Sequence, residues 1–182
     1  MKIETVSLRL EKRRDATARE ALLDAAFGAR RFEKTCERLR ETNRAADGLS
    51  LVAVKGGRLV GTLRLWPVAT GGGCSALLLG PLAVDATERS AGIGARLMRL
   101  AIKRARRAGH KAILLVGDAP YYGRFGFPAA LTSGLDLPGP VDRARFLGLE
   151  LVPGALHGAS GLLQPDAVMP ASQKPATLRL AA

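Results

Sequence analysis

A glycine-rich segment in the middle of the chain has the residue types that bind a phosphate group. It reads Arg89-Ser90-Ala91-Gly92-Ile93-Gly94 and lies between an apolar, strand-like run and an amphipathic, helix-like run. Amides in the first turn of a helix have no partner within the helix, and the helix dipole adds positive potential there. Glycines leave that backbone uncovered, and an arginine adds a charged donor. The segment therefore predicts an anion site.

The glycine spacing distinguishes between the known kinds of phosphate site. A P-loop requires Gly-x-x-x-x-Gly-Lys-Ser/Thr, and neither Lys-Ser nor Lys-Thr follows here. A dinucleotide-binding fold requires Gly-x-Gly-x-x-Gly and an acidic residue roughly 20 residues further on. Leu97 stands where the third glycine would be, and Asp118 lies too far along the chain. The pattern that remains is Arg-x-x-Gly-x-Gly.

A second cluster with chemical potential reads Tyr121-Tyr122-Gly123-Arg124-Phe125-Gly126-Phe127. A phenol has an unperturbed pKa near ~10, so it keeps its proton at neutral pH and can donate it to a leaving group. A tyrosine ring is also a large apolar surface that packs in cores. Taken alone, these residues favour packing.

Other residue types exclude several classes of site. Cys36 and Cys74 have neither a CxxC spacing nor a paired histidine spacing, which argues against zinc and against a disulfide framework, so no metal is expected. The net charge is +12, and residues 51–119 carry 11 basic and 3 acidic side chains. The excess surrounds the glycine segment rather than a terminus, which favours a local anionic ligand over a nucleic-acid arm.

Periodicity predicts the elements that must position these residues. The expected strands cover residues 6–11, 51–55, 59–67, 77–84, 112–116, 131–137 and 146–152. The expected helices cover residues 18–26, 32–42 and 92–108, and Asp15 is a candidate cap for the first of them. Gly56-Gly57 predicts a hairpin between the second and third strands.

The elements around the glycine segment form a strand, a helix and a strand joined by short links. This unit predicts two parallel strands with a right-handed crossover, and an α/β fold. Pro81 has no N–H, so it predicts a break or bulge in the strand over 77–84. The length of 182 residues suits one domain, expected over residues 1–165. The residues 166–182 are expected to be a weakly ordered tail.

Three stretches together resemble the GNAT superfamily of N-acetyltransferases, and most of all its YhbS-like bacterial branch. They are Leu79–Asp85, Arg89–Gly94 and Asp118–Phe127, and the likeness extends over roughly residues 15–165. The resemblance implies a mixed, strongly twisted sheet with helices on both faces. It also implies transfer of an acyl group, most simply acetyl, from an acyl-CoA to a primary amine.

The resemblance assigns roles to individual positions. The backbone amides of Arg89, Ser90, Ala91, Gly92, Ile93 and Gly94 would hold the pyrophosphate of coenzyme A. Leu82, Ala83 and Val84 would pair their backbone with its pantetheine arm. Tyr122 would be the general acid that protonates the leaving thiolate.

The general base is harder to assign. Some relatives carry a glutamate on the central strand, where this sequence has Leu77-Leu78-Leu79-Gly80. Glu150 lies in a near-apolar strand and is a candidate base, with a chain of water molecules as the default alternative.

A basic stripe without acidic residues follows the glycine segment: Arg96, Arg99, Lys103, Arg104, Arg106, Arg107 and Lys111. It could be a solvated face, contact the 3′-phosphate of coenzyme A, or dock an acidic acyl carrier protein. Aromatic residues total 4%, which disfavours nucleic-acid binding. An acyltransferase that uses a longer acyl chain or a carrier protein, and a CoA-sensing or docking module with weak catalysis, remain alternative functions.

No apolar run approaches the roughly 20 residues of a membrane span, and the first residues lack the pattern of a signal peptide. A cytoplasmic location is expected. No motif identifies the amine acceptor, whose pocket would involve residues 27–47 and the last third of the chain.

Overall fold

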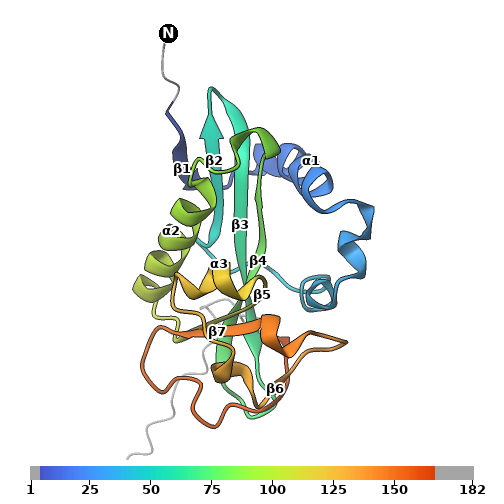
Figure 1. The fold of residues 1–182 in the computed structure, drawn as a ribbon, viewed down its shortest axis with the longest axis vertical. Coiled ribbons are helices and arrows are strands. Elements are labelled where there is room, and N and C mark those ends of the chain that lie inside the picture. The colour runs from blue at the N-terminus through green and yellow to red at the C-terminus, as the bar shows by residue number, and fades with distance from the viewer. Residues whose placement is uncertain (1–4, 167–182) are drawn as a thin grey trace, which may run out of the picture.

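The computed structural model describes residues 5–166, and a seven-stranded mixed sheet forms its centre (Figure 1). Six strands follow the order β1-β2-β3-β4-β5-β7, and β9 pairs with β3. Strands β4 and β5 are parallel, and the other neighbours are antiparallel. The strands are β1 Ser7–Leu10, β2 Ser50–Lys55, β3 Arg58–Ala69, β4 Ser75–Val84, β5 Ala112–Val116, β7 Phe146–Glu150 and β9 Gln164–Pro165, with a small second sheet of β6 Leu135–Asp136 and β8 Gly161–Leu162.

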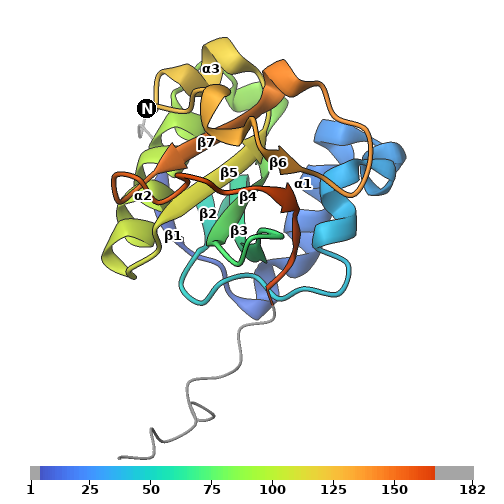
Figure 2. The same ribbon diagram turned by 90° about the horizontal axis from the view of Figure 1, so that it is seen from below.

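Helices cover both faces of this sheet, as the α/β prediction requires. Figure 2 shows α2 on one side of the strands and α1 on the other. The α-helices are α1 Ala16–Phe27, α2 Ile93–Arg107 and α3 Ala119–Gly123. Short 3-10 turns are η1 Arg13–Asp15, η2 Ala29–Glu33, η3 Thr35–Leu39, η4 Ala86–Glu88, η5 Ala130–Thr132 and η6 Arg143–Arg145.

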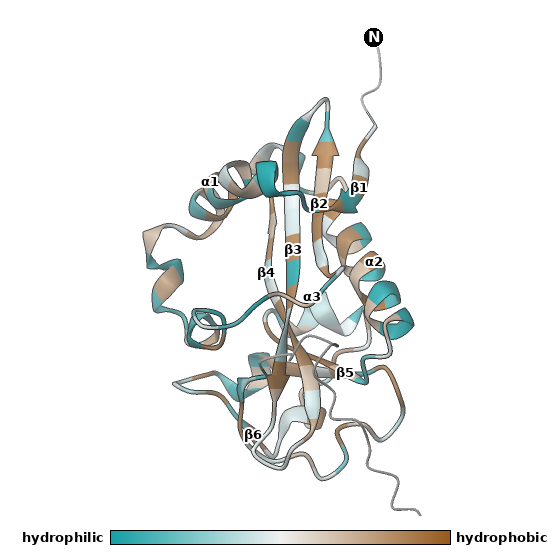
Figure 3. Cartoon of the chain, turned by 180° about the vertical axis from the view of Figure 1, so that it is seen from behind, coloured by the Kyte–Doolittle hydropathy of each residue, from teal (hydrophilic) through white to brown (hydrophobic). Residues whose placement is uncertain are grey.

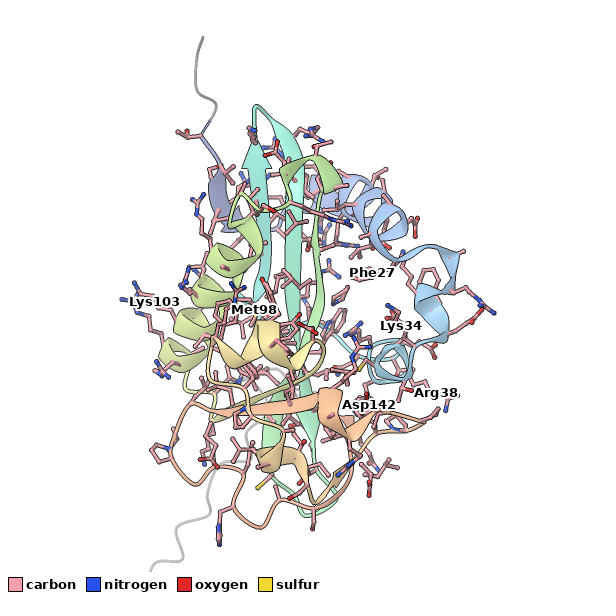
Figure 4. All side chains as sticks on the ribbon, in the orientation of Figure 1. Phe27, Lys34, Arg38, Met98, Lys103 and Asp142 are labelled. Carbon is pink, nitrogen blue, oxygen red and sulfur yellow. The ribbon has the colours of Figure 1, made fainter. Side chains whose placement is uncertain are left out.

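Helix α2 lies close against the sheet because its apolar residues recur at helical spacing. Ile93, Leu97 and Met98 are fully buried, and they belong to the larger core cluster between α2 and the strands. Gly61 on β3 allows this approach, since a Cβ there would lie 3.1 Å from both Ile93 and Leu97. The opposite side of α2 is hydrophilic, and Lys103 points into solvent while Met98 points inward (Figures 3 and 4).

The helix predicted over residues 32–42 is wrong. The structure has the two turns η2 and η3 there, separated at Lys34, whose ψ of 140° is extended. Leu39 is buried but Phe32 is 55% exposed, so the segment has no apolar stripe long enough to anchor a continuous helix. Asp15 also differs from expectation, because its carboxylate accepts from the Lys12 amide and from Arg9 and so closes η1 instead of capping α1.

The last third of the chain has less regular structure than predicted. The strand expected over 131–137 is reduced to β6, with η5 before it, whereas β7 confirms the strand expected over 146–152. The tail expected over 166–182 lies outside the described residues except for Asp166, whose amide donates to the Pro67 carbonyl.

Strand β4 changes its pairing at Gly80 and Pro81. Leu79 pairs with Leu65 on β3, and Leu82 pairs with Leu63, so two residues of β4 oppose Arg64 alone. This is the bulge that a proline without an N–H predicts. On its other edge β4 pairs with β5 only at Leu77 and Leu78, although both strands continue further.

Replacement of Leu97 by alanine tests the packing of α2 on the sheet. The side chain has no exposed surface, so Leu97→Ala should lower the free energy of unfolding by about 2–5 kcal/mol. Urea denaturation followed by circular dichroism measures the loss. The matched control Lys103→Ala, on the exposed side of the same helix, should change the free energy by less than about 0.5 kcal/mol; equal losses would contradict this packing.

Candidate functional site

The glycine segment forms a turn whose backbone faces outward at the start of α2. Ser90 and Gly92 both have φ near +70°, and Gly92 is the residue before the first helical turn. A positive φ is uncommon for serine. Where residues with positive φ alternate with other residues, successive amides turn toward one side and form a concavity that can bind an anion. A Cβ on Gly92 would meet no atom within 4 Å, so the backbone there is open.

The amides available for an anion are fewer than the sequence predicted. Arg89 and Ala91 donate weakly to the carbonyls of Ala86 and Glu88, at 3.5 and 3.3 Å. In this turn and at the start of α2, the amides of Ser90, Gly92, Ile93, Gly94 and Ala95 have no acceptor among the described residues. Helix α2 also has no acidic residue in its first turn, so the positive end of its dipole is not neutralised by its own side chains.

Two carboxylates just before this turn are neutralised by basic partners. Lys55 donates to both oxygens of Glu88, at 2.8 and 3.0 Å. Arg58 donates to Asp85 at 2.6 Å, and Asp85 also accepts from the Thr87 amide and so caps η4. Contact with Thr87, then with Arg58, holds the pKa of Asp85 below its usual range. These carboxylates act as a cap and as ion-pair partners, and their charge does not oppose a phosphate nearby.

Beyond Leu78 the edge of β4 that faces β5 has no strand partner. Leu82, Ala83 and Val84 keep their pairing to β3 on the other edge, opposite Leu63, Thr62 and Gly61. An edge with unpaired backbone groups can accept an extended chain as an additional strand. This edge leads directly from the Gly80–Pro81 bulge to the glycine segment, so one elongated ligand could occupy both.

Tyr122 lies in α3, immediately after β5 and beside this edge. Its ring crosses Gly117, where a Cβ would lie 2.1 Å from Cε2, and it makes edge contacts with Tyr121 and Phe127 at ring-centroid distances of 4.9 and 6.2 Å. Burial raises the pKa of the Tyr122 phenol to about 12, with smaller contributions from Tyr121 and Asp118. The group therefore keeps its proton throughout the neutral and mildly alkaline range.

Tyr121 has a contact that the sequence did not predict. A Cβ on Gly94 would lie 2.8 Å from the Tyr121 hydroxyl and 3.6 Å from Val84. Gly94 therefore makes room for a phenol as well as for a ligand. Arg124 lies over the Tyr121 ring at 4.5 Å, and burial raises the pKa of Tyr121 more than Arg124 lowers it.

Glu150 is distant from these residues. It pairs with Ala112 at the start of β5, whereas Val116 at the other end leads to Tyr122. Its two oxygens accept from the amides of Leu156 and Gly154, both at 2.8 Å, and these bonds lower its pKa. Glu150 thus closes the turn after β7, a position that does not favour the predicted role of base.

A pocket of about 160 Å³ opens on the face of the sheet that carries α1. Thr62, Arg64 and Trp66 reach it from β3, since alternate residues of a strand share a face, and Pro81 reaches it from the bulge of β4. Trp66 also fixes the bulge by donating from Nε1 to the Gly80 carbonyl at 2.6 Å. The only sequence signal for this pocket was the presence of polar residues in an otherwise apolar strand. No sequence pattern indicated that Arg40, which follows η3, would line it.

These features together suit a long ligand with phosphates at one end. The open amides accept the phosphates, the free edge of β4 accepts an extended arm, and the pocket at the bulge offers a separate approach from the other face. Among the described residues no group of three or more His, Cys, Asp or Glu side chains could hold a metal ion. In that same part of the chain no helix has the length and apolar character to cross a membrane.

Comparison with known proteins identifies relatives of this arrangement. The sequence profile of the Acetyltransferase (GNAT) family matches residues 16–127, which include β4, the glycine segment and Tyr122. The uncharacterized N-acetyltransferase YhbS of Escherichia coli (strain K12) is 31% identical over 162 residues, which cover 86% of this chain and 94% of YhbS.

Two solved structures share the fold. The crystal structure of E. coli YhbS in complex with CoA has a TM-score of 0.75 at 29% identity and covers 91% of this chain and 92% of its own. A GNAT family acetyltransferase from Brucella melitensis in complex with acetyl-CoA has a TM-score of 0.65 at 27% identity, with coverages of 93% and 98%.

The burial of Tyr122 can be measured directly because the chain has two tyrosines. In a Tyr121→Phe variant, Tyr122 is the sole phenol, and its ultraviolet titration should have a midpoint well above the ordinary ~10, because burial is the largest cause of its raised pKa. Circular dichroism at each pH shows whether the fold is retained. A midpoint at the ordinary value while the fold is intact would contradict the buried position across Gly117.

Proposed function

The chain belongs to the GNAT family of acyl-CoA-dependent N-acyltransferases, and we propose that it moves an acetyl group from acetyl-CoA to a primary amine. The observation that carries the proposal is the continuity between the open amides at the start of α2 and the unpaired edge of β4. Coenzyme A has a pyrophosphate joined to an extended arm, and this order of chemical groups matches the order of the two features.

We assign the donor contacts to backbone atoms. The amides of Ser90, Gly92, Ile93 and Gly94 hold the pyrophosphate, and Arg89 adds a charged side chain at the start of the turn. Leu82, Ala83 and Val84 receive the pantetheine arm along their free edge. The thioester then lies close to the bulge at Gly80 and Pro81, where it can be reached from both faces of the sheet.

The reaction joins the amine nitrogen to the acyl carbon and breaks the carbon–sulfur bond. The nitrogen must first be neutral, since a free alkylammonium has a pKa near ~10.4. After attack the nitrogen loses one further proton, and the departing sulfur gains one. A backbone amide of β4 close to the bulge can donate to the carbonyl oxygen as negative charge develops on it.

Tyr122 is the proposed donor of the proton to sulfur. Its raised pKa keeps the phenol protonated, so the group always carries the proton that the thiolate needs. Tyr122 follows β5, the strand that faces the unpaired edge of β4. Water molecules are the proposed acceptors of the amine protons, because Glu150 lies at the other end of β5.

The basic surface on α2 is a further site for the donor. Arg99, Lys103, Arg106 and Arg107 are exposed beside Arg124 and Phe125, and together they line a groove. Their charge suits the remaining phosphate of coenzyme A. An acidic carrier protein has the same charge, but no feature of the described residues favours it over coenzyme A, so we retain the CoA ester as the donor.

The proposed activity is tested by release of free thiol from acetyl-CoA in the presence of a panel of primary amines. The wild-type protein should release thiol with at least one amine, and Tyr122→Phe should lower kcat by roughly 10²–10⁴-fold, as loss of a general acid does. The KM for acetyl-CoA should change little, because the phenol acts on the leaving sulfur.

Tight binding of coenzyme A without thiol release from any amine would contradict the proposed activity and favour a CoA-sensing module. Equal kcat values for the wild type and Tyr122→Phe would remove Tyr122 from the mechanism but leave the activity. Arg44→Gln, an exposed substitution outside the groove of α2 and outside the pocket at the bulge, is the control for handling and folding.

A separate variant tests the base. Glu150→Gln should retain kcat within about threefold and its pH dependence, because the amide oxygen can still accept from one of the two turn amides and the site lies at the other end of β5. The pH–rate profile of the two proteins is the measurement. If the rate of the wild type rose with pH and the rate of Glu150→Gln did not, Glu150 would be the base.

A further inference from the structure

The pocket on the α1 face is lined by four arginines, Arg19, Arg31, Arg40 and Arg64, and three of them use at least two guanidinium nitrogens in ion pairs. Arg64 forms two hydrogen bonds to Glu11, at 2.8 and 2.5 Å. Arg19 is paired with Glu11 and Glu20, and Arg31 with Glu20 and Asp24. A guanidinium held between two acceptors has a fixed orientation and little remaining capacity to bind a ligand.

Arg40 is the exception. Its side chain is 10% exposed, yet only Nη1 has a partner, Glu37 at 3.1 Å. Its Nε is buried without an acceptor within the described part of the chain, and so is the hydroxyl of Thr62, which is 1% exposed and lines the same pocket. Buried polar groups in folded proteins nearly always have partners, so two such groups at one pocket mark it as a place where a polar ligand can bind.

The unused capacity of Arg40 is donor capacity, and the Thr62 hydroxyl can also donate. Each of the four carboxylates around the pocket, Glu11, Glu20, Asp24 and Glu37, already accepts from an arginine. A guanidinium N–H can donate only, and it requires an oxygen with negative charge for its strongest bonds. A second cationic group would have no free carboxylate here, whereas an oxyanion would complete the coordination of Arg40.

Arg40 also lies at the place where the acyl group is expected. Its Nη2 would be 2.9 Å from a Cβ added to Gly80, and Pro81 lines the same pocket. Thr62 pairs with Ala83, whose strand segment is proposed to receive the pantetheine arm along its opposite, unpaired edge. A ligand bound by Arg40 and Thr62 is therefore next to the bulge of β4. In Figure 4, Phe27 and Lys34 mark this face, and helix α2 lies on the other one.

We propose that the acceptor is an amine that also carries an oxyanion, such as a carboxylate, and that Arg40 and Thr62 bind this oxyanion. The inference rests on the proposed function, because it names the class of amine that the same site acetylates. Arg40 thus determines specificity and takes no part in proton transfer. Trp66 and Leu23 supply the apolar wall for the remainder of the acceptor.

The test compares free amino acids with their carboxamides, which keep the amine but lose the negative charge. With acetyl-CoA as donor, kcat/KM is measured by thiol release. For each amino acid that the protein acetylates, kcat/KM should be at least ~10-fold higher than for the carboxamide of the same amino acid. Arg40→Gln should abolish this preference by raising KM for the acid, without changing KM for acetyl-CoA. Arg40→Lys should restore part of it, since a single ammonium replaces a planar fork.

Two further variants separate binding from folding. Thr62→Val keeps the shape of the side chain and should lower the preference for the acid by a smaller factor than Arg40→Gln. Arg44→Gln removes an exposed arginine outside the pocket and should leave the preference intact. Equal use of acids and amides by the wild type, or an equal loss for both in Arg40→Gln, would overturn the proposal.

A binding measurement distinguishes this inference from the proposed function. Trp66 is the only tryptophan of the chain and lines the pocket, so its fluorescence reports occupancy without turnover. Saturable changes with amino acids that are absent with their amides, and lost in Arg40→Gln, would support the oxyanion site even if no thiol were released. Identical titrations with acids and amides would overturn it.

Discussion

The arrangement of the site depends on the way β4 changes partners at Gly80 and Pro81. A strand in the middle of a sheet normally has neighbours along both edges, and this one has both only as far as Leu78. A proline that cannot donate, placed opposite a single residue of β3, shifts the register and lets β4 diverge from β5. The free edge toward α2 and the pocket toward α1 are the two sides of this divergence, so donor and acceptor can meet at one bulge from opposite faces.

The α2 side and the α1 side of this bulge also differ in how their charges are distributed. On the α2 side the positive potential is diffuse and comes from open amides, a helix dipole without acidic residues in the first turn, and exposed basic side chains. On the α1 side arginines and carboxylates are equal in number and form short, oriented pairs. A diffuse positive field suits a polyanion such as coenzyme A. An ordered network with one incomplete guanidinium suits a single oxyanion at a defined position.

The proposed donor site could be predicted from the sequence because the residues that indicate it are close together in the chain. Gly92, Gly94 and the apolar stripe of α2 lie within one short segment, and Pro81 predicts its own bulge. The acceptor side depends on contacts between distant segments. Arg40 meets Gly80 only after two short turns have replaced the helix expected over 32–42, and periodicity alone could not reveal that replacement. Glu150 illustrates the same limit, since an acidic residue in an apolar strand can accept from the amides of a turn as readily as it can act as a base.

Recognition of the donor by backbone atoms has a consequence for the family as a whole. Amides and strand edges are present whatever the side chains, so a few glycines and a proline suffice to preserve a pyrophosphate and pantetheine site in proteins of low identity. Recognition of the acceptor relies on side chains such as Arg40 and Thr62, which come from segments without a family motif. Membership of the family therefore identifies the acyl donor, whereas the acceptor must be inferred from the unsatisfied groups of each pocket. In this protein those groups are a guanidinium nitrogen and a hydroxyl, and the selection that we propose for them is for negative charge.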